Sequence, residues 1–338
     1  MTEPLVSINM ITYNHAPYIA QAIEGVLQQR TNFPVELIIG EDCSTDGTRE
    51  IVFEYQRKYP DIIRVITSDK NVGAQKNGYR TVKACRGKYI AFCEGDDYWH
   101  HPDKLQKQVD YIESHPECGL VYSSYDVYHV GTKKKINDFL NNLIIYQNWK
   151  RPNNPSILDF LKGKKIGYGI LTCTVMVRRT LCEQIIESDP YLYQSGKFLR
   201  GDTQLWAEIA NISHVHYIPE SLATYNQTEE SATRSKDITK SVRLHISDAE
   251  LGLYLCNKYN LPLSTRNDME AMRCNGLLRL AFHTRNAKLA DEVRRKKRPF
   301  ACKEWLLYYG AKNLAFHYSF RLAVLFRNFF WKVYNQWL

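Results

Sequence analysis

The sequence predicts an α/β fold, with a sheet flanked by helices, followed by an all-helical region. Short apolar runs alternate with helix-like segments over the first hundred residues, and polar residues follow each run. Strand-like patterns disappear after residue 235. Strand–helix alternation with short links predicts parallel strands with helices on both faces. We therefore expect one α/β domain over residues 1–235 and a basic helical region over residues 236–338.

The first four strands are predicted by apolar runs bounded by turn residues. In the first run, Val6, Ile8 and Met10 alternate with polar residues, as in a half-buried strand. The other three runs cover residues 35–39, 62–66 and 89–93. Apolar residues at helical spacing predict helices over residues 17–27, from residue 48 onward and over residues 76–85.

The pattern changes near residue 119. Strands are predicted over residues 119–127 and 170–177, with a long polar and aromatic loop over residues 133–151 between them. A helix is expected to begin within residues 201–206, and a short strand to cover residues 215–218. Residues 236–338 read as consecutive helices.

Net charge and cysteine content indicate the kind of partner and the cellular compartment to expect. The net charge is +9, and residues 236–338 hold 19 Lys and Arg against 8 Asp and Glu. The helical region is therefore expected to touch something anionic, although no nucleic-acid recognition motif accompanies it. Nine cysteines are scattered without a C-x-x-C pair, and there is neither an apolar run of 18 residues nor a signal segment. We expect a cytoplasmic protein in a reducing compartment.

Polar loops follow all four of the first strands. In open α/β sheets, ligands bind outside the carboxyl ends of the strands, so these loops predict one shared crevice. The polar residues are Thr12, Tyr13 and Asn14 after the first strand, Glu41 and Asp42 after the second, Asn71 and Gly73 after the third, and Glu94, Asp96 and Asp97 after the fourth.

Three carboxylates in the turn Glu94–Asp97 would repel one another unless a cation lies among them. Mg²⁺ usually binds one or two carboxylates together with substrate phosphates. The turn therefore predicts a divalent cation and a diphosphate. The alternative is a solvated acidic turn before a helix that starts near Pro102.

These loops, in this order, resemble those of the family 2 inverting glycosyltransferases. The resemblance covers residues 4–235 and implies the GT-A fold, a Rossmann-like mixed sheet that binds a nucleotide-diphospho-sugar. The segments that carry it are residues 6–14, residues 41–48, residues 71–73 with Asn77, residues 94–97 and residues 201–206.

The resemblance also implies roles for single residues. Thr12, Tyr13 and Asn14 would line the nucleoside pocket and Asp42 would contact the base. The donor site would also include Glu41, Asn71, Gly73, Asn77 and Asp96. The metal would be held by Asp96, Asp97 and Glu94, and Asp202 would be the catalytic base. The chain departs from the family pattern at Cys43 and Gly201, at Glu94 in place of aspartate, and at Asn226-Gln227 in place of Arg or His.

The predicted function is metal-dependent, inverting transfer of a sugar from a nucleotide-diphospho-sugar, with a UDP-sugar as the expected donor and Mn²⁺ or Mg²⁺ as the cation. The acceptor would be a glycan or a lipid-linked oligosaccharide in surface-polysaccharide synthesis. The alternatives are a sugar-nucleotide nucleotidyltransferase and a non-catalytic nucleotide-sugar-binding protein that docks on membranes. Asp202 has an alternative of its own as a helix cap.

The end of the chain combines basic and aromatic residues. Residues 294–298 are all Arg or Lys, and Phe316–Leu338 is rich in aromatic residues with interspersed Arg and Lys. This composition predicts an interfacial helix on an anionic membrane surface, at the cytoplasmic face of the inner membrane. The alternative is a helical cap docked on the catalytic domain.

Overall fold

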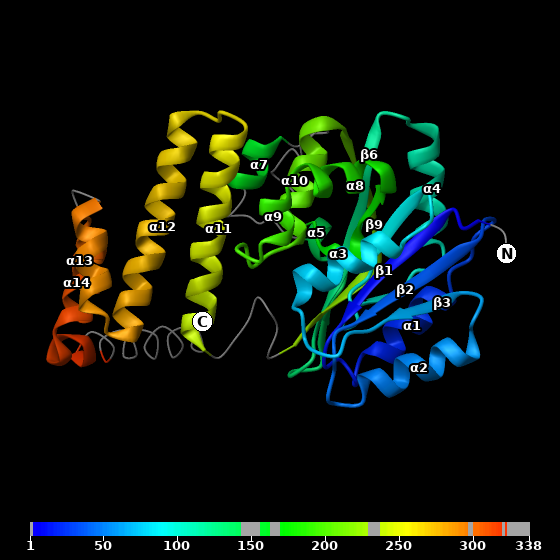
Figure 1. The fold of residues 1–338 in the computed structure, drawn as a ribbon, viewed down its shortest axis with the longest axis horizontal. Helices are drawn as coiled ribbons and strands as arrows, with labels where there is room; N and C mark the ends of the chain where they lie inside the picture. Colours follow the sequence, from blue (N-terminus) through cyan, green and yellow to red (C-terminus); the bar gives the residue numbers. More distant parts are fainter. Residues whose placement is uncertain are drawn as a thin grey trace. The chain divides into compact units, whose positions relative to one another are not determined.

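The computed structural model of the protein describes residues 3–142, 156–162, 170–228, 237–296, 300–319 and 322. The chain divides into two compact units, Met1–Glu229 and Glu230–Leu338 (Figure 1). The first contains the sheet and the second is built from helices. The functional boundary after residue 235 stays a prediction, because compactness does not assign an activity to either unit.

In the described part of the first unit, nine strands form one mixed sheet. Its order is β3 (Ile63–Ile66), β2 (Val35–Glu41), β1 (Val6–Thr12), β4 (Tyr89–Phe92), β8 (Met176–Arg178), β6 (Cys118–His129), β9 (His214–Gln227) and β5 (Tyr98–Trp99), with β7 (Lys134–Ile136) paired to β6. The four strands from β3 to β4 are parallel, whereas β8 is antiparallel to both of its neighbours. The predicted α/β fold with a mixed sheet is confirmed.

Helices cover both faces of the parallel strands. Helices α1 (Ile19–Leu27) and α2 (Thr48–Lys58) carry the chain outward from β1 to β3, and α3 (Ala74–Ala84) returns it to β4. Because such crossovers are right-handed, the return places α3 on the opposite face. Figure 1 shows α1 and α2 on one side of these strands and α3 on the other. Ile8, Ile38 and Ile39 are fully buried as a result, which explains the nearly continuous apolar runs.

The second half of the sheet differs from the sequence prediction. Residues 170–177, predicted as one strand, contain the 3-10 turn η2 (Thr172–Thr174) and only the start of β8. The Thr174 N–H and hydroxyl both donate to the Leu171 carbonyl, at 2.9 and 2.7 Å, so this carbonyl is satisfied within the turn. The short strand predicted over residues 215–218 extends over His214–Gln227, because β9 pairs along the whole of β6.

Further elements lie where none were predicted. The loop predicted over residues 133–151 contains β7 and helix α5 (Phe139–Asn142), and residues 143–151 lie outside the described residues. Three short helices, α7 (Ile157–Lys162), α8 (Arg179–Ser188) and α9 (Pro190–Gln194), were not predicted. Helices α4 (Lys104–Ser114) and α10 (Asp202–Ile212) begin near their predicted starts.

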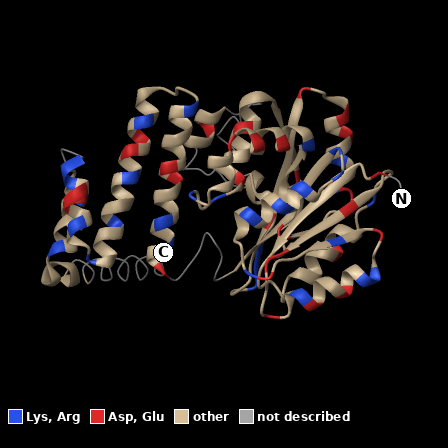
Figure 2. Cartoon of the chain, in the orientation of Figure 1, with Lys and Arg blue, Asp and Glu red and all other residues tan. Residues whose placement is uncertain are grey.

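The described residues of the second unit are mostly helical, as predicted, and include four consecutive helices. They are α11 (Ile238–Lys258), α12 (Leu263–Thr284), α13 (Ala287–Lys296) and α14 (Cys302–Lys312). Leu278, Phe282 and Leu307 belong to the core that α12, α13 and α14 share. Figure 2 shows Lys and Arg residues distributed along these helices.

The membrane prediction concerns the end of the second unit. Within the described residues, every helix is too short or too polar to cross a bilayer. Of the predicted interfacial segment Phe316–Leu338, only residues 316–319 and 322 belong to the described residues. The rest of that segment lies outside them.

Candidate functional site

The acidic turn Glu94–Asp97 leaves the carboxyl end of β4 and packs against the end of β1. The Gly95 N–H donates a 2.9 Å hydrogen bond to the Ile11 carbonyl. A Cβ atom at Gly95 would lie 2.7 Å from Thr12 Oγ1, so only glycine allows the turn to pass this close to β1. The structure thus brings together Thr12 and the predicted metal-binding carboxylates.

Asn226, near the end of β9, holds the acidic turn from its other side. Its main-chain N–H donates to Asp97 Oδ1 at 2.9 Å, and its side-chain Nδ2 donates to the Asp96 carbonyl at 2.7 Å. The pairing of β5 with β9 brings these segments together, with Tyr98 opposite Thr224. Asn226 was noted in the sequence as a departure, and the structure gives it a positioning contact.

The carboxyl groups of the turn lie close enough together to raise one another's pKa. Burial raises the pKa of Glu94 well above its usual range, and the charges of Asp96, Asp97 and Asp202 raise it further. Burial also raises the pKa of Asp97 well above its usual range, with Asp96 adding to the effect and the Asn226 N–H opposing it. A bound cation would favour the charged forms of these carboxylates.

The two carboxylate oxygens of Asp202, at the start of α10, accept hydrogen bonds from different groups. Oδ1 accepts a 2.7 Å hydrogen bond from the N–H of Thr203, within the first turn of the helix. Oδ2 accepts a 3.0 Å hydrogen bond from the Thr172 hydroxyl. The Thr172 hydroxyl also lies beside Glu94, where it opposes the rise in the pKa of that carboxyl group. One carboxylate therefore serves the helix start and reaches the acidic turn at the same time.

Thr172 was not identified in the sequence as a site residue. It lies in η2, inside the segment that was predicted to be a strand. No local pattern marks a threonine that bridges two carboxylates distant in sequence, so the sequence carried no signal for it.

His15 is a second residue that the sequence analysis missed. Its Nε2 lies 3.9 Å from Asp96 Oδ2, and its main-chain N–H donates to Thr48 Oγ1 at 2.8 Å. Among the described residues, His15 Nδ1, Thr12 Oγ1 and Asn9 Nδ2 are buried without a hydrogen-bond partner. Buried polar atoms are rarely left unpaired, so these atoms are candidates for ligand contacts beside the turn.

The loops after β1 and β2 are joined by hydrogen bonds. The Asn14 N–H donates to Ser44 Oγ at 3.0 Å, and Asn14 Oδ1 accepts from the Thr45 N–H at 2.9 Å. Asn14 has a positive φ of 56°, a conformation that asparagine tolerates better than most residues. Tyr13 beside it is 42% exposed, so its ring is available to a ligand.

Asp42 ties the loop after β2 to the loop after β3. Its Oδ1 accepts from the Val72 N–H and its Oδ2 from the Gly73 N–H, each at 2.9 Å. Gly73 takes a φ of 85°, and Asn71 Oδ1 accepts a further bond from its N–H. Asp42, Asn71 and Gly73 therefore form one connected loop junction.

Glu41 and Asn77 direct their polar atoms into the protein. Glu41 accepts from the Ser44 N–H and from Arg49 Nε, both at 2.6 Å. Asn77 donates to the Gly40 carbonyl at 2.7 Å and accepts from Arg80 Nε at 2.8 Å. Both residues shape the loops, and their predicted contacts with a nucleotide stay predictions.

No group of three His, Cys, Asp or Glu side chains in the described ranges could by itself hold a metal ion. Glu94 and Asp97 are engaged by Thr172 and Asn226, whereas the Asp96 carboxylate has His15 at 3.9 Å. Oxygen ligands suit Mg²⁺ and Mn²⁺, and one or two carboxylates are enough when phosphates complete the shell. The donor set fits a cation shared with a diphosphate better than a cage made by the protein alone.

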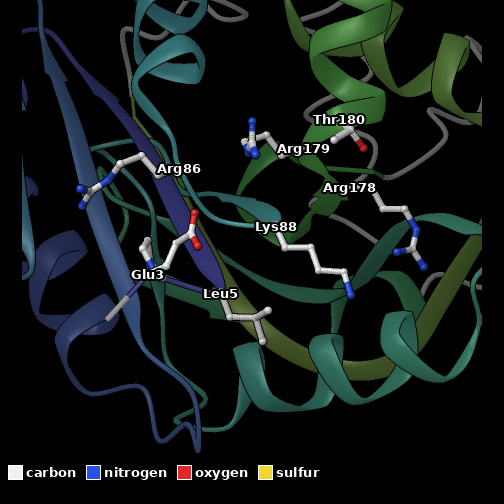
Figure 3. Close-up of a pocket in the computed structure, with 8 residues that line it drawn as sticks. Glu3, Leu5, Arg86, Lys88, Arg178, Arg179 and Thr180 are labelled. Atoms are coloured by element: carbon white, nitrogen blue, oxygen red, sulfur yellow. The ribbon is translucent and has the colours of Figure 1, made fainter. Parts of the chain in front are cut away.

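A separate cavity of about 470 Å³ lies at the amino ends of β1 and β4 (Figure 3). Its cations already have partners in the protein. Arg86 pairs with Glu36 at 2.8 Å, Lys88 with Glu113 at 2.8 Å, and Arg178 donates to the Cys118 carbonyl at 2.7 Å. Figure 3 shows these side chains pointing in different directions. The acidic turn at the other end of these strands therefore stays the candidate site.

A model of the family described as Glycosyl transferase family 2 matches residues 7–185, more than half of the chain. An uncharacterised protein of Mycobacterium tuberculosis (strain ATCC 25618 / H37Rv) is 46% identical over 129 residues, 38% of this chain and 37% of that protein. The putative teichuronic acid biosynthesis glycosyltransferase TuaG of Bacillus subtilis is 35% identical over 125 residues, 37% of this chain and 48% of that protein. The chain thus spans less than half the length of these curated relatives.

Solved structures that align with most of the chain include the following two. Residues 1–349 of TarS from S. aureus, in complex with UDP-GlcNAc, align with a TM-score of 0.51 at 18% identity, covering 94% of this chain and 92% of that one. The mannosyltransferase PcManGT from Pyrobaculum calidifontis, in complex with GDP-Man and Mn²⁺, aligns with a TM-score of 0.53 at 16% identity, covering 95% and 88%. At these identities the likeness shows the fold alone, which is the expected GT-A fold.

Proposed function

The chain belongs to glycosyl transferase family 2, and on that premise we propose that it is a hexosyltransferase-like enzyme that moves a sugar from a nucleotide-diphospho-sugar to a hydroxyl group. One observation carries the proposal. The acidic turn Glu94–Asp97 at the end of β4 is joined through Thr172 to Asp202 at the start of α10. The arrangement supplies a cation-attracting surface and a separate carboxylate for a proton.

We propose that Asp96 holds a divalent cation, Mg²⁺ or Mn²⁺, together with the diphosphate of the donor. The cation would neutralise charge on the diphosphate leaving group. A bound cation would favour the charged forms of Glu94 and Asp97, whose pKa values are raised by burial, while Asn226 fixes the path of the turn. The unpartnered polar atoms of Thr12 and His15 are available to the donor beside this cation.

Asp202 is proposed as the general base. The acceptor O–H gives its proton to the Asp202 carboxylate while the acceptor oxygen forms a bond to the anomeric carbon. The bond from that carbon to the phosphate oxygen breaks, and its electron pair leaves with the nucleoside diphosphate. A single displacement from the opposite face inverts the configuration. Thr172 orients the carboxylate through its 3.0 Å hydrogen bond.

The donor is proposed to be a UDP-sugar, with Tyr13, Asn14 and Asp42 near the base. The solved structures that resemble the chain were obtained with UDP-GlcNAc and with GDP-Man, so a test needs both nucleotides. The acceptor is proposed to be a glycan or a lipid-linked oligosaccharide. We further propose that the basic second unit contacts an anionic membrane surface at the cytoplasmic face.

The rival functions predict different contacts. A nucleotidyltransferase would need a Gly-rich loop with Arg or Lys after the first strand, and Thr12–His15 contains neither Gly, Arg nor Lys. A non-catalytic binding protein would have no need of the connection from Asp202 to the acidic turn.

The deciding experiment measures nucleoside diphosphate release from a panel of UDP-, GDP- and dTDP-sugars, with Mn²⁺, with Mg²⁺ and with EDTA. We expect metal-stimulated release that rises with a hydroxyl acceptor and gives an inverted anomer by NMR. Release of pyrophosphate would favour the nucleotidyltransferase. Tight nucleotide binding without turnover on any acceptor would favour the binding protein.

A further inference from the structure

The second unit contains a cavity of about 690 Å³ with a strongly basic lining. Helix α13 contributes Lys288, Asp291, Arg294 and Arg295, and α14 contributes Tyr308. Residues 288, 291 and 295 follow one another at three- and four-residue spacing, so they share one face of α13. The cavity lies entirely within this unit.

The acid in the lining is already neutralised. Asp291 accepts from the Tyr308 hydroxyl at 2.7 Å and pairs with Lys312 Nζ at 2.9 Å. The hydroxyl of Tyr308 in turn accepts from Arg294 at 3.1 Å. Asp291, Tyr308 and Lys312 therefore form one hydrogen-bonded network, in which Lys312 neutralises the negative charge of Asp291.

Two cations in the lining have no such partner. Lys288 and Arg295 are exposed, and neither forms an ion pair or hydrogen bond within the described residues. Arg294 is held in place, with its guanidinium 4.8 Å from the Trp305 ring centre and 5.1 Å from that of Tyr308. The cavity thus offers two free cations and one fixed one. This differs from the cavity in Figure 3, whose cations are paired.

An exposed apolar patch, made by Tyr309 and Phe316 beside Trp305, adjoins the cavity. Six of the thirteen exposed large apolar side chains in the described residues fall within residues 306–322, and they are Leu306, Tyr309, Leu314, Phe316, Tyr318 and Leu322. Trp305, which carries Arg294 on its ring, stacks on Tyr309 at 5.5 Å, and Tyr309 lies 6.3 Å from Phe316. Cationic and aromatic surfaces are therefore continuous.

We propose that this cavity binds the phosphate headgroup of an anionic membrane lipid, while the apolar patch enters the interfacial layer. Arg and Lys match phosphate oxygens, and aromatic side chains favour the boundary between headgroups and acyl chains. A soluble phosphate or a nucleic acid would leave the apolar patch exposed to water. This cavity would be the site of the membrane contact proposed above, on which the proposal rests, and lipid binding there does not require sugar transfer.

The test uses the full-length protein and phosphatidylcholine vesicles with and without phosphatidylglycerol, separated by sedimentation. The variant Lys288→Gln/Arg295→Gln removes the two free cations without breaking an internal bond. We expect its partition onto anionic vesicles to fall about thirtyfold, as for two charges at an anionic surface. The matched control, Lys240→Gln/Arg243→Gln on α11, removes two exposed cations of the same unit. It should lose less than about threefold.

Further measurements distinguish a lipid headgroup from a soluble phosphate and from a nucleic acid as the ligand of this cavity. The variant Tyr309→Ser/Phe316→Ser should weaken vesicle binding, and glycerol 3-phosphate at millimolar concentration should not displace the wild-type protein. Equal binding to neutral and anionic vesicles, or an equal loss in both cation variants, would overturn the headgroup site. Displacement by glycerol 3-phosphate, or preferred binding to an oligonucleotide that depends on Lys288 and Arg295, would overturn the assignment to lipid. Unchanged nucleotide release in both cation variants would show that any loss concerns the membrane and not the transfer.

Discussion

The main-chain N–H of Asn226 donates a 2.9 Å hydrogen bond to Oδ1 of Asp97, across 129 residues of sequence. Together with the bond from Asn226 Nδ2 to the Asp96 carbonyl, it fixes the acidic turn from the end of β9. These bonds use the Asp97 carboxylate and the Asp96 main chain, and they leave the Asp96 carboxylate available.

Asn226→Ala removes the side-chain bond to the Asp96 carbonyl and keeps the main-chain bond to Asp97. Loss of about 1 kcal/mol of positioning energy should lower kcat/KM for the donor about fivefold. Steady-state kinetics with Gln227→Ala as the control would measure this, because the Gln227 side chain makes no hydrogen bond within the described residues. A normal kcat/KM for Asn226→Ala would show that the turn Glu94–Asp97 keeps its position without the side-chain bond from Asn226.

Asp96→Ala should abolish stimulation of transfer by Mn²⁺ or Mg²⁺ while the protein stays folded. The change removes the proposed cation ligand and also relieves the repulsion felt by Glu94 and Asp97, so the unfolding midpoint should not fall. Turnover with each metal and in EDTA, alongside circular dichroism, measures both effects. Asp61→Ala, at an exposed turn after α2, is the control. Full wild-type activity in EDTA would contradict the role of the metal.

Asp202→Asn keeps the shape of the side chain and an oxygen for the Thr203 N–H, but it removes the proton acceptor. Turnover should fall by about 10²-fold or more, with little change in nucleotide affinity. Single-turnover kinetics and calorimetric titration with nucleoside diphosphate separate the two quantities. If turnover stays near normal, the Asp202 carboxylate only bonds the first turn of the helix and the base lies elsewhere.

Thr172 gives a companion test of positioning. Thr172→Val removes the hydroxyl that donates to Asp202 Oδ2, and kcat should fall about tenfold while KM for the donor changes little. Thr172→Ser retains a hydroxyl and should recover most of the loss. Equal losses in both variants would indicate that the methyl group, and not the hydrogen bond, matters.

The contribution of Glu36 to the free energy of unfolding is expected to depend on pH. Burial alone would raise the pKa of Glu36, but hydrogen bonds from Ser7 and Arg86 outweigh it and lower the pKa below the usual 4.5. The stabilisation is therefore complete above pH 4.5 and is lost as pH falls through the lower value of the folded state. Glu36→Gln should reduce the free energy of unfolding by about 1–2 kcal/mol at pH 7. Denaturant titrations at several pH values should show the gap narrowing below pH 4.5, and a constant gap would contradict this explanation.

The first four strands were predictable because their signals are local. Apolar runs such as residues 35–39 lie between turn residues, and each polar loop directly follows its strand in the sequence. The positions of Thr12 and of the turn Glu94–Asp97 at one edge follow from parallel strand order alone. The helix start at Asp202 was likewise visible in the chain.

The contacts that complete the site were not predictable, because they join distant segments. β5 is two residues long, and its pairing with β9 has no periodicity to reveal it. Thr172 lies in a turn created by a side-chain hydrogen bond inside an apolar run, which the sequence presents as a strand. His15 approaches Asp96 only because the loop after β1 folds over the start of α2, where its N–H meets Thr48.

The late position of β9 in the chain has a consequence for biosynthesis. A nascent chain that has emerged only to residue 185 already contains β1 to β4 and the acidic turn, but not Asp202 or Asn226. Parallel strands can assemble at that stage, while the turn still lacks the strand that fixes it and the carboxylate proposed to accept the proton. The ribosome must add some forty further residues before both arrive. With the roles proposed here for Asp202 and the acidic turn, catalytic competence would be the last property that this unit acquires during translation, and incomplete chains would not consume sugar nucleotides.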